Sequence, residues 1–339
     1  MIRKAAVYIS SIFLLLVPAG TSLSQEKSYT VDILQITAIE ELQQVYEGFL
    51  KELEKNGIIQ GKNLTVKRTI IDFDLTNASL TNKIKVYFRI KSEASRIAKE
   101  KPDLALTMGT PATKYSKDKI IAANVPLVFT ALAFPTLLGC KSSTEPCPGL
   151  TGVTTYMDMT EAFKVIRQTI PSMKTMGIVH SDDSNSIAHV EEAKKEGQAA
   201  GITVISKQVN MRDRITPALQ ELRKQGAESF AVPPDPYYGL HGHEKASELI
   251  DYAKANKLPV FSLVIDRFPG AVMYIGVDFH TIGTLSGKQA VKILKEGVKP
   301  DTLPILRQQD LTIIVDTKLM QSLGIQLPPE ILHAAGQVE

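Results

Sequence analysis

The chain has 339 residues but only two cysteines, Cys140 and Cys147, which lie in one loop rich in Gly, Ser, Thr and Pro. Two thiols with no nearby histidine make a poor zinc site. His241 and His243 are close in sequence and could share a metal ion, but no third ligand is in view. We therefore expect neither a metal ion nor a cofactor.

The motifs of nucleotide-binding and hydrolytic enzymes are also missing. No GxGxxG run follows an expected strand, and there is no GxSxG nucleophile elbow. The run Gly283-Thr-Leu-Ser-Gly-Lys lacks the GxxxxGK(S/T) spacing of a phosphate-binding loop. His180, Ser181 and Asp182 have the residue types of a catalytic triad, but triad members approach from separate strands and loops. We expect a protein that is not an enzyme.

The N-terminal segment predicts export. Arg3 and Lys4 form a basic start, residues 5–17 are an apolar core, and Ser22-Leu-Ser24 is a small-x-small cleavage site. This is the pattern of a secretory signal peptide over residues 1–24, and its core is too short for a comfortable membrane span. An uncleaved anchor is the alternative. No cysteine lies near the cleavage site, so we do not expect a lipoprotein but a soluble periplasmic chain.

Charge and cysteine usage fit this compartment. Residues 1–24 contain two basic and no acidic residues, so their removal lowers the formal net charge from +3 to +1. Without a basic stripe we expect no nucleic-acid partner, and no membrane insertion after cleavage. In an oxidising compartment, Cys140 and Cys147 predict a local disulfide that staples their loop.

Residues 101–135 are the stretch around which the chain is organised. Leu104 to Met108 is a short apolar run between Pro102 and Gly109, which predicts a buried strand. Residues 125–130 predict a second buried strand that ends in small residues. In an open parallel sheet, ligands bind outside the carboxyl ends of such strands.

The turn between these strands predicts a ligand contact. It places Thr110 as a helix N-cap and Pro111 at the first helical position, where a missing N–H costs nothing. The helix start then points free N–H groups and positive potential at the strand ends. We expect a carboxylate or phosphate to dock there.

Residues 226–264 repeat this order of strand, Pro-rich turn, helix and Pro-led strand, with a period of about 125 residues. Two similar α/β lobes are therefore expected, each a doubly wound parallel sheet, closing on a small molecule. The other expected strands span residues 31–36, 63–71, 151–156, 174–180 and 202–208, and the helices 39–55, 80–99, 161–170, 185–200 and 215–225. Ser184 or Asn185 is expected to cap the helix over residues 185–200.

Several segments, in order, resemble the ABC-transporter substrate-binding family that includes tryptophan and tyrosine receptors. They include KPDLALTMGTPAT, VPLVFTALAFP, MGIVHSDDSNS, LPVFSLVID, MYIGVDFHTIGTLSGKQAVKILKEG and IIVDTKLMQSLGIQLPPEILHAA. The resemblance implies a type I periplasmic-binding-protein fold with a multi-strand hinge, a first lobe of residues 25–154 plus 277–308 and a second of 155–276 plus 309–339. It also implies a monomer that serves an ABC permease and ATPase.

The family's binding positions carry over where the motifs match. The resemblance implies ligand contacts from the positions Thr37, Thr110, Pro111, Ala112, Thr130, Ala131, Asn185, Ser186, Asp235, Asp266 and Asp278. Asp278 is suited to an ammonium group, but it could instead cap the helix from Thr281, and Asp235 could only shape a turn.

The chain departs from the family at two of these places. Thr37 begins a Thr-Ala-Ile-Glu run where many members carry a Glu-His-Pro-like run, and Pro234 and Pro236 replace a common Thr and Asn. A stiffer turn suggests a different ligand. The expected function is capture of a small carboxylate-bearing solute, an amino acid or a relative, for an ABC importer. The alternative is a sensor that presents its solute to a membrane histidine kinase or chemoreceptor.

Overall fold

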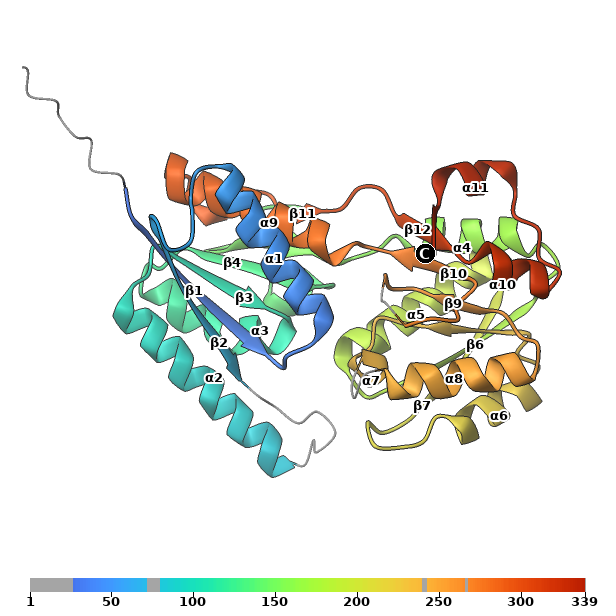
Figure 1. Cartoon of the computed structure of the whole chain (residues 1–339). Helices are drawn as coiled ribbons and strands as arrows, with labels where there is room; N and C mark the ends of the chain where they lie inside the picture. Colours follow the sequence, from blue (N-terminus) through green and yellow to red (C-terminus); the bar gives the residue numbers. More distant parts are fainter. Residues whose placement is uncertain (1–26, 72–79, 240–242, 266–267, 339) are drawn as a thin grey trace, which may run out of the picture.

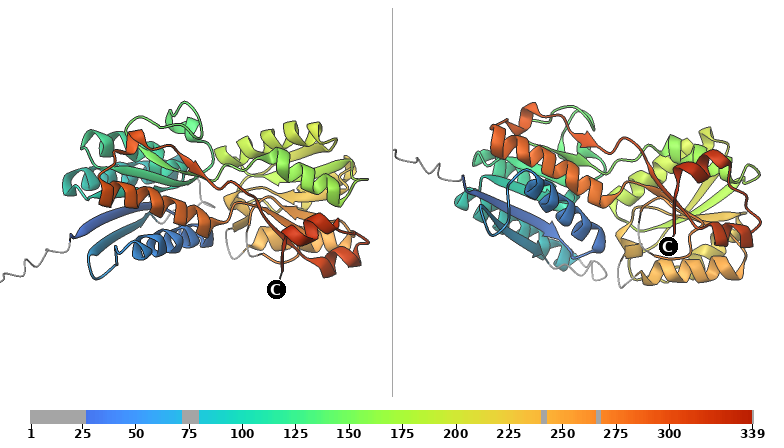
Figure 2. Two further views of the ribbon diagram at one scale, coloured as in Figure 1. Left: turned by 90° about the horizontal axis from the view of Figure 1, so that it is seen from above. Right: turned by 45° about the horizontal axis from the view of Figure 1, so that its top comes forward.

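The computed structural model describes residues 27–71, 80–239, 243–265 and 268–338. The expected signal peptide and Asp266 lie outside these residues. Two α/β lobes lie side by side in every view (Figures 1 and 2). No helix of the described ranges is both long and apolar enough to cross a membrane.

The first lobe is built on a six-stranded sheet in which the paired strands run parallel. Its spatial order is β11-β5-β4-β3-β1-β2. The strands are β1 (Tyr29–Ile36), β2 (Leu64–Ile71), β3 (Leu104–Met108), β4 (Leu127–Leu132), β5 (Thr151–Thr154) and β11 (Leu306–Arg307). The helices are α1 (Glu40–Lys55), α2 (Leu80–Glu100), α3 (Thr110–Ala122) and α9 (Phe279–Glu296), with short 3-10 turns η2 (Pro135–Leu138) and η3 (Pro300–Thr302).

The second lobe is built on a seven-stranded sheet in the order β13-β12-β10-β9-β8-β6-β7. Its strands are β6 (Thr175–His180), β7 (Thr203–Gln208), β8 (Ser229–Val232), β9 (Val260–Ser262), β10 (Met273–Gly276), β12 (Thr312–Val315) and β13 (Gly336–Gln337). Its helices are α4 (Met159–Thr169), α5 (Ser184–Ala199), α6 (Thr216–Lys224), α7 (Pro236–Gly239), α8 (Glu244–Ala255), α10 (Thr317–Ser322) and α11 (Pro329–Ala334). β12 runs antiparallel to β10, so this sheet is mixed rather than wholly parallel.

The two predicted doubly wound lobes are thus confirmed, and the chain crosses between them more than once. It crosses from β5 to α4, from β10 to α9 and from β11 to β12. Helix α9 returns to the first lobe, where its apolar face joins the core under β1 and β3. A multi-strand connection of this kind permits the two lobes to hinge about the cleft.

Helices α1 and α9 touch backbone to backbone, which fixes the side of the first lobe next to the hinge. A Cβ on Gly48 would lie 2.1 Å from the His280 carbonyl oxygen, and one on Gly283 would lie 2.1 Å from the Val45 carbonyl oxygen. Only glycine permits this approach. The packing places the start of α1 and the start of α9 beside each other (Figure 1).

Cys140 and Cys147 form the predicted disulfide in the loop between η2 and β5. Both cysteines are buried against the core of the first lobe, together with Leu138 and Leu150. The bond staples a loop on the side of the lobe away from the α1–α9 contact.

Candidate functional site

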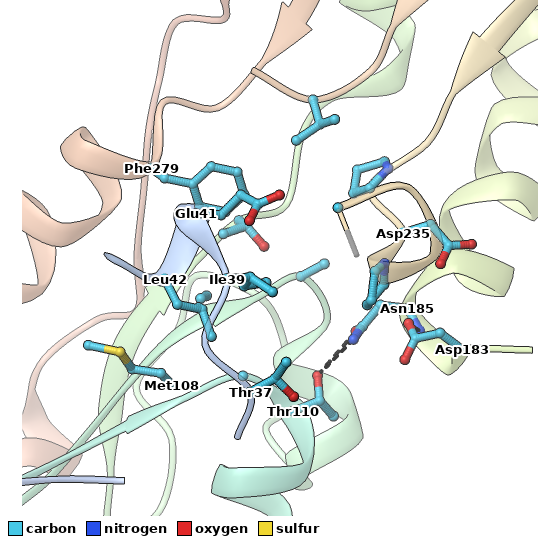
Figure 3. Close-up of a pocket in the computed structure, with 18 of the residues that line it drawn as sticks. Thr37, Ile39, Glu41, Leu42, Met108, Thr110, Asp183, Asn185, Asp235 and Phe279 are labelled. Atoms are coloured by element: carbon cyan, nitrogen blue, oxygen red, sulfur yellow. Dashed lines mark hydrogen bonds between the residues drawn. The ribbon is translucent and has the colours of Figure 1, made fainter. Parts of the chain in front are cut away.

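A cavity of about 210 Å³ lies between the lobes. Figure 3 shows its walls, with the first turns of α1 and α3 facing the start of α5 and the turn before α7. Both lobes contribute to its lining, which comprises Ile36, Thr37, Ile39, Glu41, Leu42, Met108, Gly109, Thr110, Pro111, Ala131, Ala133, Thr155, Asp183, Asn185, His189, Pro233, Pro234, Asp235, Pro236, Tyr238, Gly239, Val264 and Phe279.

The first-lobe wall is the start of α3, which has no side-chain cap. The predicted cap was wrong by one residue: Gly109, with φ 88°, is the N-cap, and Thr110 is the first helical residue. Thr113 N donates to the Gly109 carbonyl oxygen and begins the helical ladder. Pro111 has no N–H, so the N–H groups of the first helical turn belong to Thr110, which lines the cavity, and Ala112, which does not.

Because Thr110 is not the cap, its hydroxyl reaches across the cleft. The Asn185 Nδ2 of the second lobe donates to the Thr110 Oγ1 at 3.0 Å. This bond is drawn in Figure 3. The structure therefore brings together two residues that lie 75 positions apart in the chain.

The second-lobe wall begins at α5, and here the helix start is capped. The expected cap, Ser184 or Asn185, was wrong: Asp183 is the N-cap, and its carboxylate accepts hydrogen bonds from the N–H groups of Asn185 and Ser186. Ser186 is buried, and its hydroxyl also contacts the Pro234 carbonyl oxygen. Ser186 is therefore part of the support for this wall.

Asp235 lines the cavity, but its carboxylate is engaged by its own lobe. It accepts hydrogen bonds from Ser181 N at 2.6 Å, from Ser181 Oγ at 2.8 Å and from Tyr237 N at 2.9 Å. Burial raises the pKa of Asp235, and these hydrogen bonds act in the opposite direction. The carboxylate joins the β6–α5 loop to the Pro-rich turn.

Two lining residues have left-handed backbone conformations. Thr37, at the end of β1, has φ 70°, and Ala131, near the end of β4, has φ 53°. A β-branched residue rarely adopts such a φ, and strain of this kind persists where the surroundings over-determine it. Thr37 is held by Gln35 Nε2, which donates to its carbonyl oxygen, and by its own N–H, which donates to Ile71.

Other expected contacts lie behind the walls. Thr130 and Ala112 are fully buried and are not part of the cavity lining. Thr130 Oγ1 accepts a hydrogen bond from Ser286 on α9. Asp278 is the N-cap of α9, where Oδ1 accepts from Thr281 N at 2.6 Å, so the alternative role for Asp278 accounts for its position.

The structure adds two polar residues that sequence reasoning missed. Glu41, in the first turn of α1, lies across the cleft from Gly239, where a Cβ would be 3.3 Å from its Oε1. His189 lies on α5, one turn after Asn185, and is 2% exposed. Burial lowers the pKa of His189 to about 4, so the imidazole is neutral at neutral pH.

Comparison with known proteins agrees with this architecture. The family model described as ABC transporter substrate binding protein matches residues 30–339. A tyrosine-binding protein from Clostridioides difficile is 22% identical over 306 residues, which cover 89% of this chain and 82% of that protein.

Solved structures show the same fold. An ABC domain from Streptococcus pneumoniae in complex with L-Trp is 21% identical, with a TM-score of 0.73 and coverage of 91% of this chain and 100% of that one. A solute-binding protein from R. palustris in complex with 4-hydroxybenzoate is 18% identical, with a TM-score of 0.60 and coverage of 81% and 83%. Because the family model spans nearly the whole described chain, the protein belongs to the ABC transporter substrate-binding family.

Proposed function

We propose that the protein captures a small carboxylate-bearing solute, an amino acid or a relative, between its lobes and delivers it to an ABC importer. The observation that carries the proposal is the uncapped start of α3, which opens onto a cavity lined by both lobes. A helix start of this kind offers N–H groups and positive potential to an anion.

No lysine or arginine occurs among the described residues that line the cavity. Among these described residues, the start of α3 is the feature that we propose as the partner of a solute carboxylate. The Thr110 N–H group is the donor we assign to it, because Ala112 is fully buried and does not line the cavity. Hydrogen bonds to a charged acceptor are about twice as strong as neutral ones, and exclusion of water adds to this.

We assign the solute's ammonium group to Glu41. The sequence pointed to Asp278 for this role, but Asp278 caps α9 and does not line the cavity, whereas the Glu41 carboxylate does. Glu41 stands in the first turn of α1, close to Phe279 (Figure 3). The α1 dipole stabilises its negative charge there.

The size of the cavity restricts the solute. About 210 Å³ is below the roughly 300–1,000 Å³ of pockets that hold drug-sized ligands. An amino acid or a single-ring aromatic acid is of the right size, whereas a disaccharide or peptide is too large. The tyrosine-binding relative and the structures with L-Trp and 4-hydroxybenzoate are in keeping with this class.

Capture requires that the lobes close on the solute. Helix starts from both lobes meet at the Thr110–Asn185 bond, so a solute seated beside it contacts both walls. A solute that touches both lobes only when they are closed shifts the population to the closed state. We propose the lobe boundaries to be those inferred from the sequence, with the crossovers near residues 155, 277 and 309 acting as the hinge.

A thermal-shift screen followed by calorimetry tests the binding proposal. Free amino acids and aromatic acids are compared with their primary amides, which keep the shape and lose the charge. At about a hundred times the dissociation constant, a binding acid should add roughly 2.7 kcal/mol of stability. Equal stabilisation by acid and amide would contradict the carboxylate assignment.

Delivery is tested in cells that lack the protein. The importer function predicts that uptake of the identified solute is lost and is restored by the wild-type chain. Normal uptake together with a lost transcriptional or chemotactic response to the solute would favour the sensor function instead.

A further inference from the structure

His189 is a polar residue in the wall of the cavity, and no hydrogen bond within the described residues explains why a histidine stands there. It lies on α5 four residues after Asn185, so the two side chains share one face of the helix. Asn185 contacts Thr110 at the start of α3. His189 is therefore about 6 Å farther along the helix axis from that anion-binding end.

The ring of His189 is buried without a hydrogen bond at one nitrogen. The side chain is 2% exposed, and Nδ1 has no partner among the described residues. A buried polar group without a partner costs about 1–3 kcal/mol. Most buried side-chain nitrogens in proteins are bonded, so each exception calls for a missing partner.

The described side chains around the ring do not supply that partner. Phe134 packs against the imidazole at 5.2 Å between ring centroids, and Tyr156 packs against Phe134 at 6.1 Å. The Tyr156 hydroxyl donates to Glu192 on the next turn of α5. The cavity, which His189 lines together with Ala133 and Thr155, is the place from which a partner can come.

We propose that His189 selects solutes that carry a hydroxyl or N–H group at the end remote from their carboxylate. The proposal rests on the proposed function, because it takes the carboxylate to lie at the start of α3. A neutral imidazole has one donor and one acceptor nitrogen, so it bonds a phenol hydroxyl or a ring N–H equally well. A solute whose far end is a bare hydrocarbon leaves the ring unsatisfied.

This arrangement discriminates more strongly than an apolar pocket. An apolar wall cannot reject a solute that differs by one hydroxyl, whereas a site built to bond that hydroxyl rejects the analogue that lacks it. We expect the wild-type protein to prefer the polar member of a matched pair by about 10- to 100-fold.

The test uses calorimetry with the pairs tyrosine and phenylalanine, and 4-hydroxybenzoate and benzoate. In His189→Phe, which keeps an aromatic ring and removes both nitrogens, the preference should fall to about 1, mainly through weaker binding of the hydroxylated member. His189→Asn restores a polar atom near Nδ1, and His189→Gln restores one near Nε2. Partial recovery in one of them identifies the nitrogen used.

The control variant is Glu191→Gln, an exposed position on the same helix, which should keep the wild-type preference. Equal wild-type affinity for both members of each pair would overturn the role of His189 and leave the carboxylate site standing. A His189→Phe protein that keeps the preference would do the same. If no carboxylate binds more tightly than its amide, the proposed function fails, and this inference fails with it.

Discussion

The starts of α3 and α5 face each other across the cleft but are finished in opposite ways. Helix α3 begins at Gly109, which has no side chain to cap it. Helix α5 begins at Asp183, whose carboxylate bonds the N–H groups of Asn185 and Ser186. One helix start is left open for an anion from outside, and the other is closed by its own chain.

The difference suggests that the two similar lobes contribute to solute binding in different ways. The first lobe supplies positive potential through backbone N–H groups, which recognise any carboxylate. The second lobe supplies side chains: Asn185 bonds Thr110 of the first lobe, and we propose that His189 distinguishes one solute from another. Its helix start is satisfied internally, so it does not compete for the carboxylate.

The largest expected effect comes from closing the open helix start. Thr110→Asp places a carboxylate in the first turn of α3, where it repels a solute carboxylate. Like charges brought together at an interface cost several kcal/mol, so we expect solute affinity to fall about 1,000-fold in calorimetry. Thermal stability should hold or rise, because an acid suits a helix N-terminus.

Thr110→Val is the matched control for this variant, because it keeps the shape and removes only the hydroxyl. We expect the solute affinity of Thr110→Val to fall about 10-fold. Unchanged affinity in Thr110→Asp would mean that the solute carboxylate lies elsewhere.

The burial of His189 in the second-lobe wall can be tested by measuring how the stability of the protein changes with pH. The pKa of His189 is lowered from 6.5 to about 4 by burial. Between these values the unfolded chain binds a proton that the folded chain does not, so stability falls as the pH falls from 6.5 to 4, by about 3 kcal/mol for this residue.

Chemical denaturation at several pH values measures this effect as the difference between wild type and His189→Phe. Burial raises the pKa values of Glu192 and Asp235, which give the opposite slope in both proteins and cancel in the difference. Parallel stability curves for the two proteins would contradict a buried neutral imidazole.

The contact that joins the two helix starts should matter less for affinity than the open start of α3. Asn185→Leu removes the bond to Thr110 and keeps a similar volume. We expect solute affinity to fall about 10-fold through a less stable closed state, in line with the loss of one hydrogen bond. Small-angle scattering should show a larger radius for the solute-free variant, while Gln198→Leu on the exposed face of α5 should match wild type.

The smallest effect comes from opening the closed helix start. Asp183→Ala removes the cap of α5, which should cost about 1 kcal/mol in urea denaturation. Affinity should change little, because the carboxylate site is on the other lobe. A loss of affinity as large as that of Thr110→Asp would show that both helix starts bind the solute.

Much of the fold could be predicted from short-range pattern. The run Leu104 to Met108 is the strand β3 that its apolar composition indicates, because both faces of a central parallel strand are buried. The pairing of strand β12 was harder to predict. Its antiparallel alignment with β10 depends on where the chain enters the second lobe after its last crossover.

The site was predicted only where local sequence determines it. The start of α3 could be identified from Gly109 and Pro111, although the cap lay one residue earlier than expected. His189 lies within a helix whose sequence gives no sign of a binding residue. It lines the cavity only because of how the two lobes are oriented toward each other. Asp278 has the same local pattern as a cap and as a ligand contact, so spacing alone could not separate the two roles.

A crystal structure of the protein with the solute found in the screen would test the central claim most directly. We predict that a solute carboxylate oxygen lies about 3 Å from the Thr110 backbone nitrogen, with both lobes in contact with the solute. A carboxylate directed away from α3, or a solute held by one lobe alone, would contradict the account.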